Sequence, residues 1–180
     1  MTVVTQPTQL VFTQGRPFFE MVMSFLAATV GMGPVFDTTN PLGLSPQMQA
    51  GYRGIIKTDV VIDMNQVHTQ CISGALSPDI AVKSLCCMLL NSTYEIAKPF
   101  NDFSPEFEIF RHLRNAASHK NHFDFHANEP SRPAYWAGLN IDHNLKGNTN
   151  PLAGTECVGT LVSAGDIIAL LYEIEAKLPN

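Results

Sequence analysis

The stretch SPEFEIFRHLRNAASHKNHF, Ser104 to Phe123, decides how this chain folds. Its Ser-Pro pair is typical of a helix start, because serine caps free backbone N–H groups and proline at the first helical position loses no hydrogen bond. Apolar residues then recur at helical spacing, namely Phe107, Phe110, Leu113 and Ala117. We therefore predict a helix over about 105–119 that packs into a core through this apolar side.

The rest of this helix carries an unusual set of polar residues. An unbroken helix would align on one face Arg111, Asn115, His119 and His122. Solvated helix faces favour Glu and Lys, whereas four of the chain's six histidines fall between His112 and His126. Arg114 lies five residues before His119, which is about 140° around a regular helix and about 7.5 Å along it. Arg114 therefore reaches His119 only through its long side chain, a loosened helix end or a second copy of the chain.

Composition sets the frame for the whole chain. Its 180 residues fit one domain, residues 1–180, in which 1–15 form a polar N-terminal arm. Hydrophobic residues make up 45% and supply an adequate core, whereas charged residues are only 15%, below the roughly 25% that is usual. So little surface charge suggests that part of the surface is covered in a homo-oligomer. The net charge of −5 argues against a broad nucleic-acid-binding face, although a local basic cleft remains compatible with it.

Cysteine usage and hydropathy indicate a reduced, cytoplasmic protein. The four cysteines lack the C-x-x-C spacing of metal or redox sites. The apolar run PFFEMVMSFLAATVG, Pro17 to Gly31, is interrupted by Glu20, is too short to span a bilayer and follows no basic cluster. We predict a core helix over 16–30 and no membrane segment. Four methionines are further core candidates, Met21, Met23, Met32 and Met88.

The flanking sequence predicts a mainly helical chain with one small β-hairpin. Ser45-Pro46 and Ser77-Pro78 repeat the Ser-Pro start signal, and the second predicts a helix over 78–98 with several apolar positions, Ile80, Val82, Leu85, Met88, Leu89 and Ile96. The Ser45-Pro46 pair leaves two possibilities. Either a helix starts at Pro46, or Gly51 and Gly54 delay the helix, which then covers 55–72. The segments AYWAGLNI and ECVGTLV are expected to pair as two strands. Ser163 and Asp166 predict a capped last helix with five buried apolar positions, Ile167, Leu170, Leu171, Ile174 and Leu178.

The segment RNAASH, Arg114 to His119, resembles the R-x4-H motif of the HEPN superfamily, the higher eukaryotes and prokaryotes nucleotide-binding domain. Asn115, directly after the arginine, is the commoner form of that motif. The order of elements is similar as well, since an aromatic strand-like segment with Trp136 and a D-I-I-A-L-L helix follow. The resemblance covers about 18–178 in layout and 107–122 in motif. In antitoxin-controlled members a tyrosine stands two residues after the motif histidine, and here that residue is Asn121.

The resemblance implies a HEPN-like bundle of about five helices and a homodimer in which two motifs face each other. It also implies a metal-independent endoribonuclease of toxin or defence type, with RNA or a nucleotide as ligand and an antitoxin protein as a further partner. Arg114 and His119 are then catalytic and Asn115 supports them, with Arg111, Ser118 and His122 as secondary substrate-binding residues. No cofactor and no metal are expected. Attack by the ribose 2′-hydroxyl, with His119 as general base or acid, leaves 2′,3′-cyclic phosphate and 5′-hydroxyl ends.

Two other hypotheses stay open. A non-catalytic, nucleotide-binding or regulatory module of the same layout fits the acidic net charge and the sparse basic residues. A metal site could use His119, His122 and His126, with Asp124 or His143 near. Phe123 and Phe125 alternate with these residues, however, and indicate an extended segment rather than a helix that would align the histidines.

Overall fold

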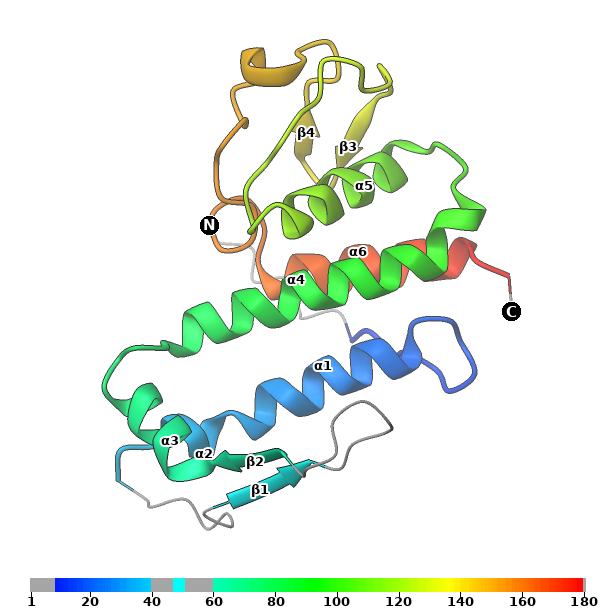
Figure 1. Ribbon diagram of the computed structural model, residues 1–180. Coiled ribbons are helices and arrows are strands. Elements are labelled where there is room, and N and C mark those ends of the chain that lie inside the picture. Colours follow the sequence, from blue (N-terminus) through cyan, green and yellow to red (C-terminus); the bar gives the residue numbers. More distant parts are fainter. Residues whose placement is uncertain (1–8, 40–46, 51–59, 180) are drawn as a thin grey trace, which may run out of the picture. The chain divides into compact units, whose positions relative to one another are not determined.

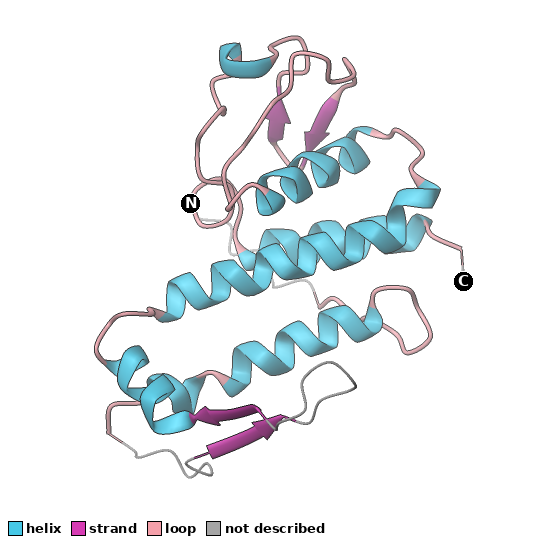
Figure 2. Ribbon diagram, viewed as in Figure 1, coloured by secondary structure: helices cyan, strands magenta, loops and turns pink. Residues whose placement is uncertain are grey.

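The computed structural model describes residues 9–39, 47–50 and 60–179. As predicted, the chain is mainly helical with a small hairpin before the last helix, and five of the described helices have nine or more residues. It divides into two compact units, Leu26–Val82 on the one hand and Met1–Phe25 with Lys83–Asn180 on the other. Each unit is described by itself (Figures 1 and 2). The single domain expected over 1–180 stays a prediction.

The smaller unit combines helices with a β-hairpin that the sequence did not predict. It holds the end of α1 (Phe19–Gly31), α2 (Gly33–Phe36), β1 (Gln47–Ala50), β2 (Val60–Asp63), α3 (Met64–Ile72) and the start of α4 (Pro78–Ala97). The strands pair antiparallel, with Gln47 opposite Asp63. The Asp63 side chain accepts hydrogen bonds from the backbone N–H groups of Asn65 and Gln66, at 2.9 and 3.3 Å, and so caps α3.

The helix predicted over 55–72 is therefore wrong in its first part. The run Val60-Val61-Ile62 is β-branched and pairs as a strand, and the helix begins only after the Asp63 cap. A helix that starts at Pro46 is wrong too, because 47–50 form a strand. Pro46 itself, together with Gly51, Gly54 and the first eight residues of the predicted arm, lies outside the described residues.

The first helical stretch is more exposed than a core helix. Val22 and Phe25 are buried, whereas Leu26 is 38% and Val30 is 79% exposed. By length and composition, Phe19–Phe36 would suffice to cross a membrane, and 11% of it is buried. The prediction of a core helix holds for its first turns only. Other predicted core residues are also exposed, namely Met23, Ile80 and Met88.

The larger unit is built around α4, η1 (Lys98–Phe100), α5 (Pro105–Ser118) and α6 (Ala164–Lys177), close to the bounds predicted for these helices. Aromatic rings join α5 to its neighbours, since Tyr94 of α4 lies 5.3 Å from the Phe110 ring and Phe18 lies 6.5 Å from it. The five apolar residues predicted for the last helix are all buried. Their helix starts at the predicted capping box, in which Ser163 and Asp166 bond to each other's backbone N–H groups.

The two other serine caps differ from each other. Ser77 caps α4, because its hydroxyl accepts the N–H of Ile80 at 3.2 Å. Ser104 occupies the N-cap position of α5 but makes no side-chain cap; its hydroxyl accepts a hydrogen bond from Lys177 instead. The Ser45 position lies outside the described residues.

The hairpin forms within AYWAGLNI rather than between the two predicted segments. β3 (Ala134–Trp136) and β4 (Leu139–Ile141) pair antiparallel across a turn at Ala137 and Gly138. Both turn residues have positive φ, 47° and 86°, as two-residue hairpin turns of type I′ require. The segment ECVGTLV instead bonds to the residues after α5, with an isolated bridge between His122 and Glu156. The prediction that it is the second strand was wrong because the Ala-Gly turn lets the first segment pair with itself.

A buried polar network ties the loop after α5 back onto this helix. Glu108 is fully buried, and its carboxylate contacts Arg111 Nε at 2.8 Å and Arg132 Nη1 at 3.3 Å. Arg111 also lies 3.6 Å from the carboxylate of Glu129, a loop residue. His112, in the same network, contacts Arg111 through Nε2 at 3.0 Å. Burial, with the nearby charges of Arg111 and Lys146, lowers the pKa of His112 to about 3, so its ring is neutral.

We expect Glu108→Gln to destabilise the larger unit strongly, because it leaves two arginines without their shared counter-charge. Removal of one partner of a buried ion pair costs about 3 kcal/mol or more. The matched control is Asp102→Asn, whose carboxylate forms an exposed pair with Lys177 at 3.6 Å and should cost less than about 1 kcal/mol. Urea unfolding measures both. Equal losses in the two variants would contradict a stabilising role for the network.

We expect part of the acid sensitivity of this protein to come from His112. Between pH 6.5 and about 3 the unfolded chain binds a proton at this histidine that the folded chain does not, so the free energy of unfolding falls as pH falls through this window. His112→Gln should reduce the slope against pH by about one proton. The measurement is urea unfolding at pH 5 and pH 7, with His122→Gln as the exposed control. An unchanged slope in His112→Gln would refute the assignment.

Candidate functional site

The candidate site lies at the C-terminal end of α5, where the helix ends at the last residues of the predicted motif. α5 ends at Ser118, and His119 is its C-cap residue with φ −104° and ψ 48°. Lys120 and Asn121 follow in the left-handed region, with φ of 57° and 66°, and turn the chain back. Such a backbone is uncommon for residues other than glycine. Here side-chain bonds support it, since Asn121 accepts the N–H of Val158 at 2.8 Å and donates to the Val158 carbonyl at 3.0 Å.

The predicted continuous face from Arg111 to His122 is therefore interrupted. His122 is not on the helix, and its Nδ1 lies 2.8 Å from the carbonyl oxygen of Lys120. The reversal has a consequence for His119, because it brings the residues after the helix back beside this imidazole. The prediction that Arg111, Asn115, His119 and His122 share one helix face assumed an unbroken helix. The chain instead reverses after Ser118, and this turn decides which residues lie beside His119.

His119 faces a carboxylate across the reversed chain. Its Nδ1 lies 3.3 Å from Oδ2 of Asp124, and the two side chains are 49% and 46% exposed. The ring of His126 lies 6.4 Å from the ring of His119, at 71° to it. Suitable ligand atoms of His119, Asp124 and His126 all fall within 4.8 Å of one another. Two imidazoles and one carboxylate thus converge on the surface beside the end of α5.

Alternating burial of the segment after the helix explains this convergence. Phe123 and Phe125 are buried and their rings stack at 5.7 Å, nearly parallel. Backbone bonds hold the segment in place, from Phe123 N to Thr155 O at 3.0 Å and from Gly154 N to Phe123 O at 2.8 Å. In an extended chain, residues two apart share a face. The aromatic alternation that counted against a metal site in the sequence is what places Asp124 and His126 together in the structure.

Arg114 points to α4 and not to His119. Its Nη2 donates to Glu95 Oε1 at 2.8 Å, and its guanidinium lies 5.1 Å from the Tyr94 ring centre. Its Nη1 is 3.5 Å from the side-chain oxygen of Asn115, at the limit of a hydrogen bond. Its Nε is buried without a hydrogen-bond partner among the described residues. Arg114 and His119 thus contact separate groups, as the helical spacing of the motif predicts for a single chain.

The secondary candidates take other roles. Arg111 lies in the buried network with Glu108 and Glu129, so its contacts stabilise the fold. Ser118 donates its hydroxyl to the side-chain oxygen of Asn91 of α4 at 2.6 Å. His122 is exposed and is not part of the cluster of His119, Asp124 and His126. Reasoning from sequence missed Glu95 as the partner of Arg114, and it named Asp124 only as a group near a metal site of His119, His122 and His126. Nothing in the sequence singles out Glu95. The i, i+2 spacing of Asp124 and His126, in contrast, indicates that their side chains share a face in an extended segment.

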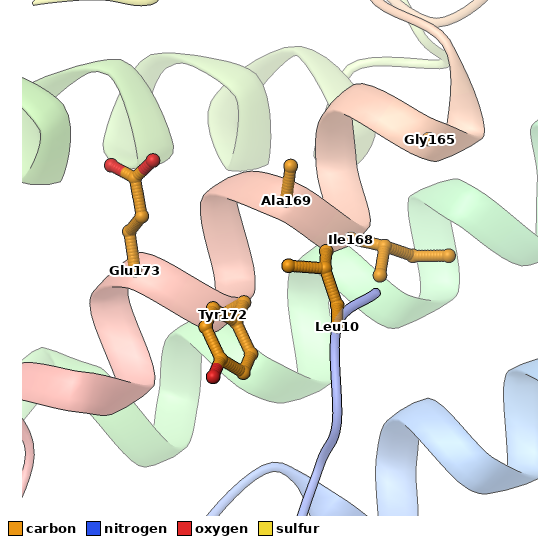
Figure 3. Close-up of a pocket in the computed structure, with 6 residues that line it drawn as sticks. All are labelled: Leu10, Gly165, Ile168, Ala169, Tyr172 and Glu173. Carbon is orange, nitrogen blue, oxygen red and sulfur yellow. The ribbon is translucent and has the colours of Figure 1, made fainter. Parts of the chain in front are cut away.

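A separate hollow lies on α6. This open depression has a volume of about 550 Å³ and is lined by Leu10, Gly165, Ile168, Ala169, Tyr172 and Glu173. Figure 3 shows Leu10 of the N-terminal segment facing Ile168, with the Tyr172 ring beside them. The Glu173 carboxylate at its edge already accepts a hydrogen bond from Trp136 Nε1 at 2.7 Å, which holds β3 against α6. The hollow contains no residue of the motif, and the chemistry-bearing groups lie at the end of α5.

We compared the chain with protein families, curated proteins and solved structures, and the interpretation of the site depends on its geometry alone. No protein-family model, no curated protein and no solved structure matches this chain significantly.

Proposed function

We propose that this protein is a ribonuclease of the HEPN type, with a site composed of Arg114 from one chain and His119 from another. The observation that carries the proposal is the exposed pair of His119 and Asp124, 3.3 Å apart, at the end of the motif helix. A carboxylate on Nδ1 holds the imidazole in one orientation and leaves Nε2 free to exchange a proton. This arrangement is typical of a general base, and it adds to the motif a partner that the resemblance did not supply.

The proposed reaction uses groups that the chain provides. His119 takes the proton of a ribose 2′-hydroxyl, whose oxygen attacks the adjacent phosphorus. The bond from phosphorus to the 5′-oxygen breaks, that oxygen takes up a proton from water, and His119 returns its own proton to the solvent. The products are a 2′,3′-cyclic phosphate and a 5′-hydroxyl end. Asp124 acts as a positioning residue, because it orients His119 without touching the substrate.

Arg114 is the proposed phosphate-binding residue. Its present partner, Glu95, is 56% exposed, and exposed ion pairs contribute at most about 1 kcal/mol. A phosphate that offers two oxygens to the guanidinium fork competes well with such a carboxylate. Asn115 and Lys120 lie nearby in the sequence, and from Arg111 to Lys120 the chain has three basic residues and no acidic one. Arg111 is paired with Glu108 and Glu129, so Arg114 and Lys120 are the two basic groups that support contact with RNA despite the net charge of −5.

The separation of Arg114 and His119 in one chain supports a homodimer. Within the chain the arginine contacts α4 and the histidine contacts the loop, so a site that needs both groups is completed by a second copy. We further propose that the protein is cytoplasmic, that it acts as a toxin or defence nuclease, and that an antitoxin protein is its partner. Asn121, in the position of the tyrosine of antitoxin-controlled members, is engaged with Val158 and contributes no hydroxyl for modification.

A non-catalytic module that binds nucleotides or RNA is the second candidate. The orientation of Arg114 favours it, because the guanidinium contacts Glu95 and not His119, so a single chain does not bring the two motif groups together. Such a module binds RNA without cutting it. The experiment below therefore separates the two functions.

We expect the purified protein to cleave tRNA or total RNA and to leave cyclic phosphate ends. His119→Ala should slow cleavage by at least about 100-fold, because general acid–base catalysis contributes that much. Asp124→Asn should slow it less, and should change its pH profile, because the histidine loses its orienting charge. His143→Gln is the control histidine. RNA that stays intact with both the wild type and His119→Ala would refute the nuclease.

We expect the two inactive variants Arg114→Ala and His119→Ala to restore each other's activity when they are refolded together. A mixed dimer has one complete site, so random mixing should recover about a quarter of the wild-type rate. Each variant alone measures the background. Failure of the mixture to exceed that background, with mixed dimers present by mass spectrometry, would show that the two residues do not work across two chains.

A further inference from the structure

We propose that His119, Asp124 and His126 form a binding site for a divalent transition-metal ion, with Zn²⁺ as the preferred ion. This site goes beyond the proposed nuclease, because ion binding is a property of the folded chain and is measured without RNA. The proposal stands on three independent features of the larger unit: the spacing of the ligand atoms, the backbone that holds them and the chemistry of the set.

The spacing of the ligand atoms fits a tetrahedral ion. Bonds of 2.0–2.1 Å to zinc place two ligands of a tetrahedron about 3.3 Å apart. His119 Nδ1 and Asp124 Oδ2 are 3.3 Å apart. One ligand atom from each of His119, Asp124 and His126 can be chosen so that all three lie within 4.8 Å of one another. All three side chains are exposed, so a small rotation about their side-chain bonds closes the remaining separation without disturbing the core.

The backbone holds the three residues ready for the ion. His119 is the C-cap of a helix, and its N–H bonds to the carbonyls of Asn115 and Ala116 at 3.1 and 3.0 Å. Asp124 stands between Phe123 and Phe125 in the sequence, and burial of both rings prevents the segment from turning over. Burial of alternate residues thus keeps the acid and His126 on the exposed side. Little ordering remains to be done when the ion binds, and this favours affinity.

The donor set selects the class of ion. Imidazole suits zinc, copper, iron and nickel, whereas magnesium and calcium require oxygen ligands. Three protein ligands leave a fourth position of the tetrahedron open to water. His122 and His143, which the sequence also offered as ligands, do not belong to the cluster. Of the five metal ligands that the sequence offered, the structure therefore brings three together. A histidine outside the cluster serves as the control of the experiment.

An ion at this site and proton transfer by His119 exclude each other. A metal-bound imidazole has given its lone pair to the ion and cannot accept a proton from a hydroxyl. Binding is therefore tested on the protein alone, so its outcome is distinct from that of the cleavage assay. A protein that cuts RNA and binds no zinc would refute this inference only, and one that binds zinc but cuts no RNA after a chelator has removed the ion would refute the nuclease only.

The test is zinc titration of the full chain by isothermal calorimetry after treatment with a chelator, with Co²⁺ absorption as a second readout of tetrahedral geometry. We expect one ion per chain and a loss of affinity above about 100-fold in His126→Ala, since even residues that only support metal ligands are worth 10–100-fold. His122→Ala, a change of another exposed histidine that lies outside the cluster, should retain binding. Excess Mg²⁺ should not compete.

Several results would overturn the proposal. One is the absence of stoichiometric zinc binding by the wild type. Another is an equal loss in His122→Ala and His126→Ala, which would indicate diffuse binding by surface histidines. Competition by Mg²⁺ would refute the ion class. Circular dichroism of each variant establishes that it is folded, and Asp124→Asn, which keeps the shape of the side chain, gives a second variant with the expected loss.

Discussion

Glu108 is fully buried on α5, and its carboxylate is held by Arg111 on the same helix and by Arg132 from the loop that follows. A buried charge is costly unless paired and hydrogen-bonded, so this carboxylate requires the loop to return to the helix. Glu129 adds a second contact to Arg111. The chain between the helix end and Arg132 is thus anchored at both ends, and the candidate site lies within it.

The two histidines of the motif helix show how environment separates similar residues. Burial, together with the charge of Arg111, keeps His112 neutral, and its ring lies 5.4 Å from that of Phe125 in the loop. His119 lies at the end of the same helix, half exposed, with a carboxylate as its neighbour. A sequence lists both as histidines on a polar helix. Only the second is available to a hydroxyl, a phosphate or an ion, and this difference supports its place in both proposals.

The positions of the main helices could be predicted from the sequence, because capping residues and apolar helical spacing involve residues only a few positions apart. The last helix begins at its capping box and buries the five residues that its spacing selects. Strand pairing did not follow, because any of several segments can supply a partner. The Ala137-Gly138 turn allowed AYWAGLNI to pair with itself, and ECVGTLV then bonded to the chain after α5. At Val60-Val61-Ile62, β-branched residues that also fit a helical pattern formed a strand.

The sequence by itself determined that the chain is mainly helical, where α4, α5 and α6 lie, and that an arginine, an asparagine and a histidine stand close together along the last turns of α5. These properties depend on residues a few positions apart. The tertiary structure decided which groups these residues contact. Glu95 pairs with Arg114 from 19 residues away, and Asp124 reaches His119 because Lys120 and Asn121 reverse the chain. The partners of a charged side chain depend on where distant segments and turns bring opposite charges, and no local spacing contains that information.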